Sequence, residues 1–259
     1  MKKSRAILLI AAGLVTLAAV PVAANTATTR RITTPRLIAD EIHITTYTIY
    51  ERQIEPVTVV DNSLLPWNLK LVNRYNFLDT GFAPPLESMG GGHYFDARAA
   101  HSLWLMLESA RAEGLRPIII SAHRSIARQR TLFNNQVNHH MGRGLSRADA
   151  FEAARRVVAY PGSSEHNLGL AVDIVSHNHR SLNAAFGRTP EGRWLAQNAH
   201  RYGFILRYPY HKQHITNIIY EPWHFRYVGV EHATTMFERD LVLEEYVAEF
   251  LHFLKYGGW

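Results

Sequence analysis

The stretch Ser164-Glu165-His166-Asn167-Leu168-Gly169-Leu170-Ala171-Val172-Asp173 is followed, further along the chain, by Glu221-Pro222-Trp223-His224. His166, Asp173 and His224 offer two imidazoles and one carboxylate, a set that holds zinc and leaves its fourth coordination position open. Glu221 is a free carboxylate beside the last of these residues, where it could serve as general base for a metal-activated water. The two segments together predict a zinc hydrolase.

Context separates these residues from the other histidines of the chain. The sequence contains 15 histidines in 259 residues, so accidental metal-like spacings are expected. Asp173 lies inside the apolar run 170–175, where an unpaired carboxylate is costly. On spacing alone, a metal ligand and a salt-bridged core aspartate are about equally good interpretations of Asp173. The competing pairs, each typical of solvated surface histidines, are His139 with His140, His177 with His179, and His211 with His214.

Three motifs resemble those of the VanY-type D-alanyl-D-alanine carboxypeptidases, which are zinc peptidases of the bacterial cell wall. They are the Ser164-x-His166-x-x-Gly169-x-Ala171-x-Asp173 pattern, residues 221–229 and residues 121–125, and they occur in the family's order. The similarity runs from about residue 65 to residue 251. It implies an α+β fold: a single catalytic domain with a small, mainly antiparallel central sheet flanked by helices and a zinc site in a surface cleft. His123 and Ala122 stand where the family usually has Tyr and Gly, which changes one pocket wall.

The resemblance also implies the roles of individual residues. Zn²⁺ is expected on His166, Asp173 and His224, with Glu221 moving the proton and Arg124 stabilising the oxyanion. On spacing alone, Arg124 is better explained as an exposed helix arginine, and only the match to the family's Ser-x-x-Arg-Ser segment reverses that interpretation. The match extends more weakly to Gln129. The expected substrate contacts are Ser164, Gln129, Trp223 and His123, although a turn that orients His166 explains Ser164 equally well from the residues alone.

By resemblance, the substrate is a peptidoglycan stem peptide ending in D-Ala-D-Ala, from which one residue is released by a protein expected to act as a monomer. L,D-carboxypeptidase, D,D-dipeptidase and endopeptidase activities on the same wall peptides remain alternatives. A zinc-stabilised wall-binding module without turnover is a further alternative. Glu221 argues against that module, because a purely structural zinc site normally fills its fourth position with a ligand.

The N-terminal residues have the layout of a secretory signal. Lys2, Lys3 and Arg5 precede the uncharged residues 6–24, which end in Val22-Ala23-Ala24. The alternative is an uncleaved membrane anchor, since an apolar run of this length could just span a bilayer. Either interpretation places the rest of the chain outside the cytoplasm. Residues 25–60 are predicted to form a Thr-rich linker with a short extended segment at 42–50, and residues 61–259 the catalytic domain.

Composition narrows the possible partners. The formal net charge is +6, and removal of residues 1–24, with three bases and no acids, leaves +3. No basic block interleaved with aromatic residues occurs, so the sequence argues against nucleic-acid binding. Cysteine is absent. Any metal must therefore be bound through nitrogen and oxygen.

Local patterns predict the main elements. Helices are expected at 95–113, from the cap Ser146 to residue 158, and from Thr189-Pro190-Glu191 towards Gly203. Strands are expected at 117–121, 204–207 and 224–228, and one amphipathic helix at 234–255. Glu221 and His224 are three residues apart and would point to opposite faces of a regular strand. We therefore expect a bend at Pro222 and a strand that begins near Trp223.

Overall fold

The computed structural model describes residues 27–38, 41–52, 59–79 and 81–257. The chain divides into two units, Met1–Glu55 and Pro56–Trp259. The predicted signal or anchor at residues 1–24 lies outside the described residues. Among the described residues, no helix has both the length and the apolar character that a membrane crossing requires.

The first unit contains a β-hairpin. Strand β1 (Ala27–Ile38) pairs antiparallel with β2 (Glu41–Arg52) in a sheet of their own. The strand predicted at 42–50 is confirmed. The linker expected in the Thr-rich start of residues 25–60 is wrong for residues 27–36, which belong to the partner strand β1. Their many threonines are β-branched and favour extended backbone even without an apolar alternation to signal it.

The second unit is built on a four-stranded sheet with the order β5-β6-β8-β7, in which every neighbouring pair is antiparallel. This confirms the predicted α+β fold with an antiparallel sheet. All residues of β6 are buried, whereas the edge strand β5 is partly exposed. The strands are β5 (Pro117–Ser121), β6 (Ala171–Ser176), β7 (Phe204–Leu206) and β8 (His224–Tyr227), and a separate hairpin consists of β3 (Leu86–Gly90) and β4 (His93–Asp96).

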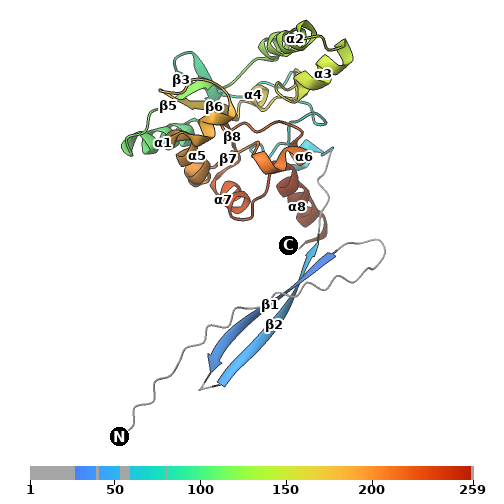
Figure 1. Ribbon diagram of the computed structural model, residues 1–259, viewed down its shortest axis with the longest axis vertical. Helices are drawn as coiled ribbons and strands as arrows, with labels where there is room; N and C mark the ends of the chain where they lie inside the picture. Colours follow the sequence, from blue (N-terminus) through green and yellow to red (C-terminus); the bar gives the residue numbers. More distant parts are fainter. Residues whose placement is uncertain (1–26, 39–40, 53–58, 80, 258–259) are drawn as a thin grey trace. The chain divides into compact units, whose positions relative to one another are not determined.

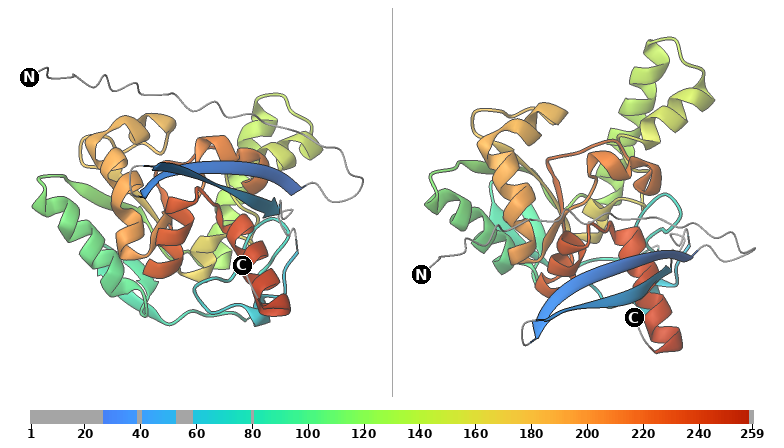
Figure 2. Two further views of the ribbon diagram at one scale, coloured as in Figure 1. Left: turned by 90° about the horizontal axis from the view of Figure 1, so that it is seen from below. Right: turned by 60° about the horizontal axis from the view of Figure 1, so that its bottom comes forward.

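Helices surround this sheet (Figure 1). The pair α2 and α3 lies at one end of the unit and projects from it in the second view of Figure 2, whereas α7 and α8 lie towards the other end. Helices α1 and α5 contact each other, and between them they contact β5, β6 and β7. The helices are α1 (Ala100–Ala112), α2 (Ile126–Gly142), α3 (Arg147–Arg155), α4 (Glu165–Leu168), α5 (Pro190–Asn198), α6 (Gln213–Thr216), α7 (Val230–Glu238) and α8 (Leu243–Tyr256).

Most predicted elements occur with shifted ends. The helix expected at 95–113 begins only at Ala100, because His93–Asp96 pairs with β3. Ser146 caps α3 as predicted, accepting a hydrogen bond from the Asp149 amide, but α3 ends at Arg155. Helix α5 has the predicted Thr189 cap and Pro190 in its first turn.

The helix predicted at 234–255 is wrong as a single element. It is two helices, α7 and α8, separated at Asp240, whose positive φ of 51° belongs to the left-handed region that a continuing helix does not use. The break lets α8 pack into a second hydrophobic cluster that includes Leu71, Val228 and Leu243. The main hydrophobic cluster lies around Leu103, Val172 and Phe225. The sheet and α8 belong to the same unit, Pro56–Trp259.

Candidate metal centre

Two adjacent strands and a one-turn helix bring the predicted metal ligands together. Asp173 on β6 lies directly opposite His224 on β8 in the antiparallel register. His166 comes from α4, which immediately precedes β6, and Gly169 ends that turn with φ at +83°. One ligand atom from each residue lies within 4.8 Å of the other two. The ligands are only 3–5% exposed, so the centre lies beneath the surface of the unit.

The hydrogen bonds show which atoms face the centre. His166 Nδ1 lies 2.7 Å from the Ala122 carbonyl, which leaves Nε2 facing Asp173 Oδ2 at 3.2 Å. His224 turns Nδ1 towards Asp173 Oδ1 at 3.1 Å and Nε2 towards Glu165 Oε2 at 3.5 Å. Asp173 Oδ1 is buried, and although it lies close to His224 Nδ1, it forms no hydrogen bond of acceptable geometry with the described residues. A buried anionic oxygen beside two imidazole nitrogens fits the nitrogen and oxygen ligands that zinc accepts.

Glu221 is placed beside this centre by the predicted bend. The His224 amide donates to the Glu221 carbonyl at 3.1 Å, which closes a turn through Pro222, and β8 begins at His224. Glu221 Oε2 lies 3.8 Å from His224 Nδ1. Burial raises the pKa of Glu221 to about 8, although the charge of His224 opposes the shift. This carboxyl group is therefore suited to exchanging a proton near neutral pH.

Arg124 lies on another side of the centre. Its Nη2 donates to Ser121 Oγ at 2.9 Å and lies 3.5 Å from Asp173 Oδ2. Its Nη1 donates to Gln129 Oε1 at 2.8 Å, and Gln129 Nε2 donates to the Ala159 carbonyl at 2.7 Å. The Gln129 side chain is fully buried. Gln129 was predicted to contact substrate, but both ends of its amide are engaged within the protein, and its visible contact with the site is through Arg124.

The other predicted substrate contacts have structural partners of their own. Ser164 is buried and its Oγ accepts from the His166 amide at 3.3 Å, as expected for a residue that orients this ligand. Trp223 belongs to the main hydrophobic cluster. The His123 amide donates to the Tyr94 carbonyl at 2.7 Å, and partial burial lowers the pKa of its side chain. Contacts of these three side chains with substrate stay predictions.

The competing histidines lie elsewhere. His211 Nε2 is 2.9 Å from Asp240, and His179 Nε2 is 3.2 Å from Asn183 Oδ1. Within the described ranges, His166, Asp173 and His224 form the one group of His and acidic side chains that could converge on a metal.

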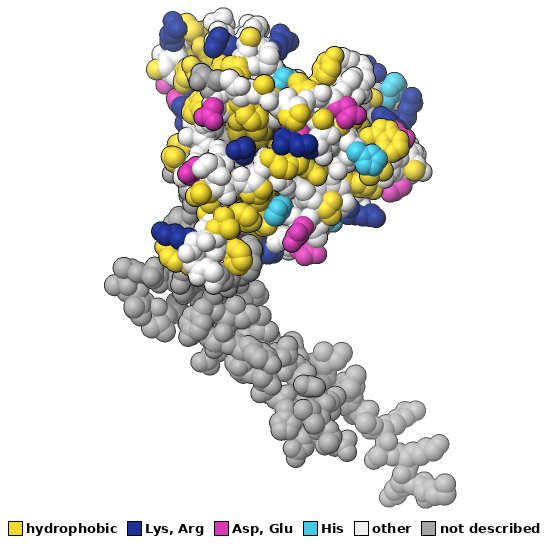
Figure 3. Space-filling model, turned by 180° about the vertical axis from the view of Figure 1, so that it is seen from behind, with side chains coloured by type: hydrophobic (Ala, Val, Ile, Leu, Met, Phe, Trp, Pro, Cys, Tyr) yellow, Lys and Arg dark blue, Asp and Glu magenta, His cyan; other side chains and the backbone are white. Residues whose placement is uncertain are grey.

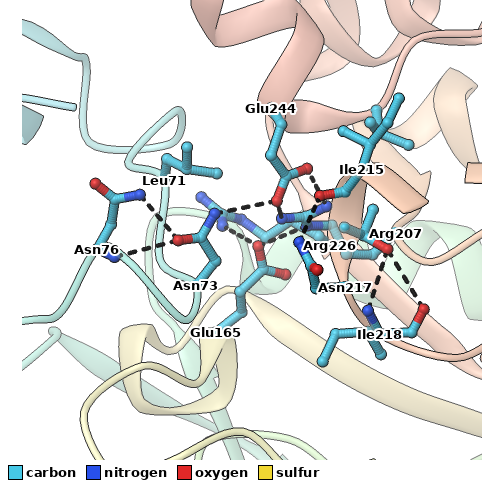
Figure 4. Close-up of polar contacts among 12 residues, drawn as sticks. Leu71, Asn73, Asn76, Glu165, Arg207, Ile215, Asn217, Ile218, Arg226 and Glu244 are labelled. Carbon is cyan, nitrogen blue, oxygen red and sulfur yellow. Dashed lines mark hydrogen bonds and ion pairs between the residues drawn. The ribbon is translucent and has the colours of Figure 1, made fainter. Parts of the chain in front are cut away.

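A buried network behind His224 was missed by sequence reasoning (Figure 4). Glu165 Oε1 accepts from Arg207 Nε at 2.8 Å and from Arg226 Nη1 at 2.9 Å, while Arg207 also forms two hydrogen bonds to Glu244. Burial alone would raise the pKa of Glu165, but the two guanidinium groups lower it far below its usual value. The sequence did contain a sign of this network, because Arg207 directly follows an apolar strand and Arg226 lies within one. A charged residue in an apolar run is also what drew attention to Asp173.

A two-histidine, one-carboxylate centre with a protonatable glutamate beside it leaves zinc one position for water, and by class this makes the domain a metal-dependent hydrolase. The family comparison is more specific. Residues 92–230 match the model of VanY, D-alanyl-D-alanine carboxypeptidase, and the chain belongs to this family.

Similar proteins agree with this assignment. A D-alanyl-D-alanine carboxypeptidase of Enterococcus faecalis (strain ATCC 700802 / V583) is 40% identical over 70% of this chain and 66% of its own length. The putative carboxypeptidase YodJ of Bacillus subtilis (strain 168) is 45% identical over 76% of this chain and 73% of its own length. The match thus spans about two thirds to three quarters of these relatives.

Solved structures show the same fold. VanYB in complex with D-alanine-D-alanine has a TM-score of 0.66 at 40% identity, with 70% of this chain and 98% of that chain covered. A mutant of the D,D-pentapeptidase VanY in complex with Zn(II) has a TM-score of 0.64 at 40% identity, covering 70% and 99%. The LdcB LD-carboxypeptidase has a TM-score of 0.61 at 39% identity, covering 70% and 86%. The predicted family of zinc carboxypeptidases is confirmed, and the trio on β6, β8 and α4 is the candidate zinc site.

Proposed function

We propose that this protein releases the terminal D-alanine from peptidoglycan stem peptides that end in D-Ala-D-Ala. The observation that carries the proposal is the position of Glu221, a buried carboxyl group 3.8 Å from the imidazole of a metal ligand. A structural zinc site has no use for such a group. The VanY family match and the relatives named above support the D,D specificity.

The residues of the centre divide the chemistry among them. Zinc, held by His166 Nε2, His224 Nδ1 and the Asp173 carboxylate, would supply Lewis acidity to the scissile carbonyl and to water. Glu221 takes the proton of the attacking water and delivers it to the leaving amine. Because its pKa is about 8, both the uptake and the release of this proton need little free energy near neutral pH.

Arg124 stabilises the negative charge that develops on the carbonyl oxygen. Its guanidinium group is held by Gln129 Oε1 and Ser121 Oγ, so it is already oriented before substrate arrives. Pre-organised donors of this kind cost no reorganisation during the reaction. We propose that Gln129 serves the reaction through this support of Arg124.

The decisive experiment measures release of D-alanine by the purified protein with zinc, and separately with a chelator. The substrates are a wall pentapeptide ending in D-Ala-D-Ala and the tetrapeptide that lacks the last residue. Zinc-dependent release from the pentapeptide, lost in Glu221→Gln, is the expected result. Cleavage of the tetrapeptide alone would show an L,D-carboxypeptidase, the activity named for the similar LdcB structure. Zinc binding without turnover of either peptide would show a binding module.

Export is a second part of the proposal. We propose that residues 1–24 direct the protein across the cytoplasmic membrane and that the catalytic domain works there as a monomer. Support comes from the basic start and uncharged run of this segment and from the location of wall peptides outside the membrane.

On the face seen in Figure 3, basic and acidic side chains are scattered among hydrophobic ones. Mass measurement of the protein recovered from cells, with sedimentation analysis, tests cleavage and oligomeric state.

A further inference from the structure

A chain of buried charges connects Glu165, which lies beside the metal ligand His224, to helix α8. Figure 4 shows its members Glu165, Arg207 and Glu244. Glu165 Oε1 accepts from the Arg207 Nε at 2.8 Å. Arg207 then donates from Nη1 and Nη2 to the two carboxylate oxygens of Glu244, at 2.8 and 2.7 Å. Glu244 lies in the first turn of α8. Each of these side chains is almost completely removed from water, so their interactions are screened little by solvent.

The end of this chain meets His224 on the side away from the metal position. His224 Nε2 and Glu165 Oε2 lie 3.5 Å apart, and both are buried atoms that lack another hydrogen-bond partner among the described residues. When Nδ1 of an imidazole binds a metal, Nε2 carries the proton and donates it. Glu165 Oε2 is the acceptor that faces it. A carboxylate placed behind a ligating histidine fixes the ring and raises its basicity.

A second contact links Arg207 to the same ring. The Arg207 guanidinium lies over the Tyr208 ring, 4.9 Å from its centroid, and the Tyr208 ring lies 4.9 Å from the His224 ring. Arg207 therefore reaches His224 both through a carboxylate and through an aromatic ring. The position of the Arg207 guanidinium depends on Glu244, which holds its two terminal nitrogens.

We propose that Glu244 is a positioning residue of the metal centre: it fixes Arg207, which fixes Glu165 and Tyr208 against the ligand His224. The proposal gives α8 a role in zinc binding, although α8 lies beyond residues 92–230, the part matched by the family model. It rests on the zinc site of the proposed function and is independent of which peptide bond is cleaved.

A purely structural ion pair is the competing explanation. Buried ion pairs are poor sources of stability, because desolvation offsets their attraction, and well-packed apolar side chains often replace them without loss. Apolar side chains could not orient Glu165. Arg207 and Arg226 both bind Glu165 Oε1, and Glu244 neutralises one of them. Without that charge, Arg207 attracts Glu165 more strongly and draws its carboxylate away from His224.

The test compares two substitutions on the same helix. Glu244→Gln removes the buried charge while keeping the shape of the side chain. Glu249→Gln makes the same change in a partly exposed pair, because Glu249 binds Arg239 at 2.7 Å and the Arg239 side chain is 46% exposed. The measured quantity is the zinc dissociation constant, from competition with a chelator at a temperature where circular dichroism shows native protein.

We expect Glu244→Gln to weaken zinc binding about tenfold, within the range for residues behind metal ligands, and Glu249→Gln by less than about twofold. Glu165→Gln, which acts directly on His224, should weaken binding at least as much. Adding Glu244→Gln to Glu165→Gln should weaken it by less than tenfold further, because the two residues act through one path.

Equal zinc affinity in Glu244→Gln and Glu249→Gln would overturn the proposal, and so would fully multiplicative effects of the Glu244 and Glu165 substitutions. If Glu244→Gln does not fold, Glu244→Asp and Glu249→Asp replace the pair, and zinc affinity must still fall in the first variant relative to the second. No peptide is needed for this assay, so a wrong substrate assignment leaves it intact. Absence of zinc binding in the unsubstituted protein would instead overturn the proposed function.

Discussion

Replacing Gln129 with methionine separates two possible roles of this residue, direct contact with substrate and support of Arg124. Methionine has nearly the size of glutamine but can neither accept from Arg124 Nη1 nor donate to the Ala159 carbonyl, bonds of 2.8 and 2.7 Å in the structure. The site is fully buried, so water cannot replace them. We expect the free energy of unfolding to fall by about 1–3 kcal/mol, the cost of a buried unsatisfied partner.

The effect on catalysis follows from what still holds Arg124. Its Nη2 keeps the bond to Ser121 Oγ and the contact with Asp173, so the guanidinium is loosened but not released. Removing a donor to an oxyanion costs about 10²–10³ in kcat, which is the expectation for Arg124→Met. Loosening it should cost less, about tenfold or about 1.4 kcal/mol of activation free energy, in Gln129→Met.

The assay is the steady-state release of D-alanine by both single variants and the double variant, with zinc content measured in each. If Gln129 acts through Arg124, the double variant has the kcat of Arg124→Met alone, because nothing remains to be positioned. A further tenfold loss in the double variant would refute this reasoning and support direct contact with substrate. Gln136→Met is the control, because Gln136 lies on the same helix and contacts only His140 among the described hydrogen bonds; its kcat should be unchanged.

Three further predictions concern the centre and its turn. Glu221→Gln should lower kcat by about 10²–10⁴ while the zinc content stays at that of the unsubstituted protein, as checked by product release and metal analysis. Burial lowers the pKa of His224, but Asp173 and Glu165 outweigh burial and raise it to about 9, so zinc must displace a proton below that pH. The zinc dissociation constant, measured by competition, should therefore rise about tenfold for each pH unit that the solution falls below about 9. A dissociation constant that does not change with pH would contradict the assignment of His224 as a metal ligand. Gly169→Ala should destabilise the fold by about 1 kcal/mol more than Gly114→Ala in denaturant unfolding. Both glycines have φ near +80°, but an added Cβ meets Pro84 at 3.1 Å only in the first.

Asp173 could be singled out because its chemical conflict with its surroundings is local, whereas its assignment as a metal ligand with His166 and His224 came from the family motifs. Asp173 is a carboxylate in an apolar run, and this is visible without any knowledge of the fold. The bend at Pro222 was equally accessible, since the two-residue period of a strand forbids Glu221 and His224 from facing one metal. In both cases the argument needs only neighbours in sequence.

The residues behind the ligands could not be paired in this way. Arg207 and Arg226 raise the same conflict as Asp173, and so their burial is open to inference from sequence. Their partners are not, because Glu165 lies 42 residues from Arg207, and Glu244 lies 37 residues away on the other side. A single sequence shows that a buried charge needs compensation but does not show which distant carboxylate provides it.

Element boundaries failed where distant pairing overrode a local pattern. The helix predicted from residue 95 overlaps the end of β4, which forms because β3 offers residues 93–96 a hydrogen-bonding partner. The Thr-rich segment 27–38 likewise becomes a strand because β2 satisfies its backbone groups. At Asp240 the sequence continues the helical spacing of hydrophobic residues, but the left-handed backbone there and the extended backbone of Val242 separate α7 from α8.

The two glutamates nearest His224 show how one buried centre gives the same functional group two tasks. Glu165 accepts from two guanidinium groups, and its pKa falls far below the usual value. Glu221 has no such partner among the described hydrogen bonds, and burial raises its pKa to about 8. Near neutral pH the first is a permanent anion, suited to holding an imidazole, and the second is a proton carrier. Environments that push the pKa values of neighbouring carboxyl groups apart assign acid–base roles in active sites. Here Arg207 and Arg226 keep Glu165 ionised, and the burial of Glu221 without such a partner leaves it able to take up a proton.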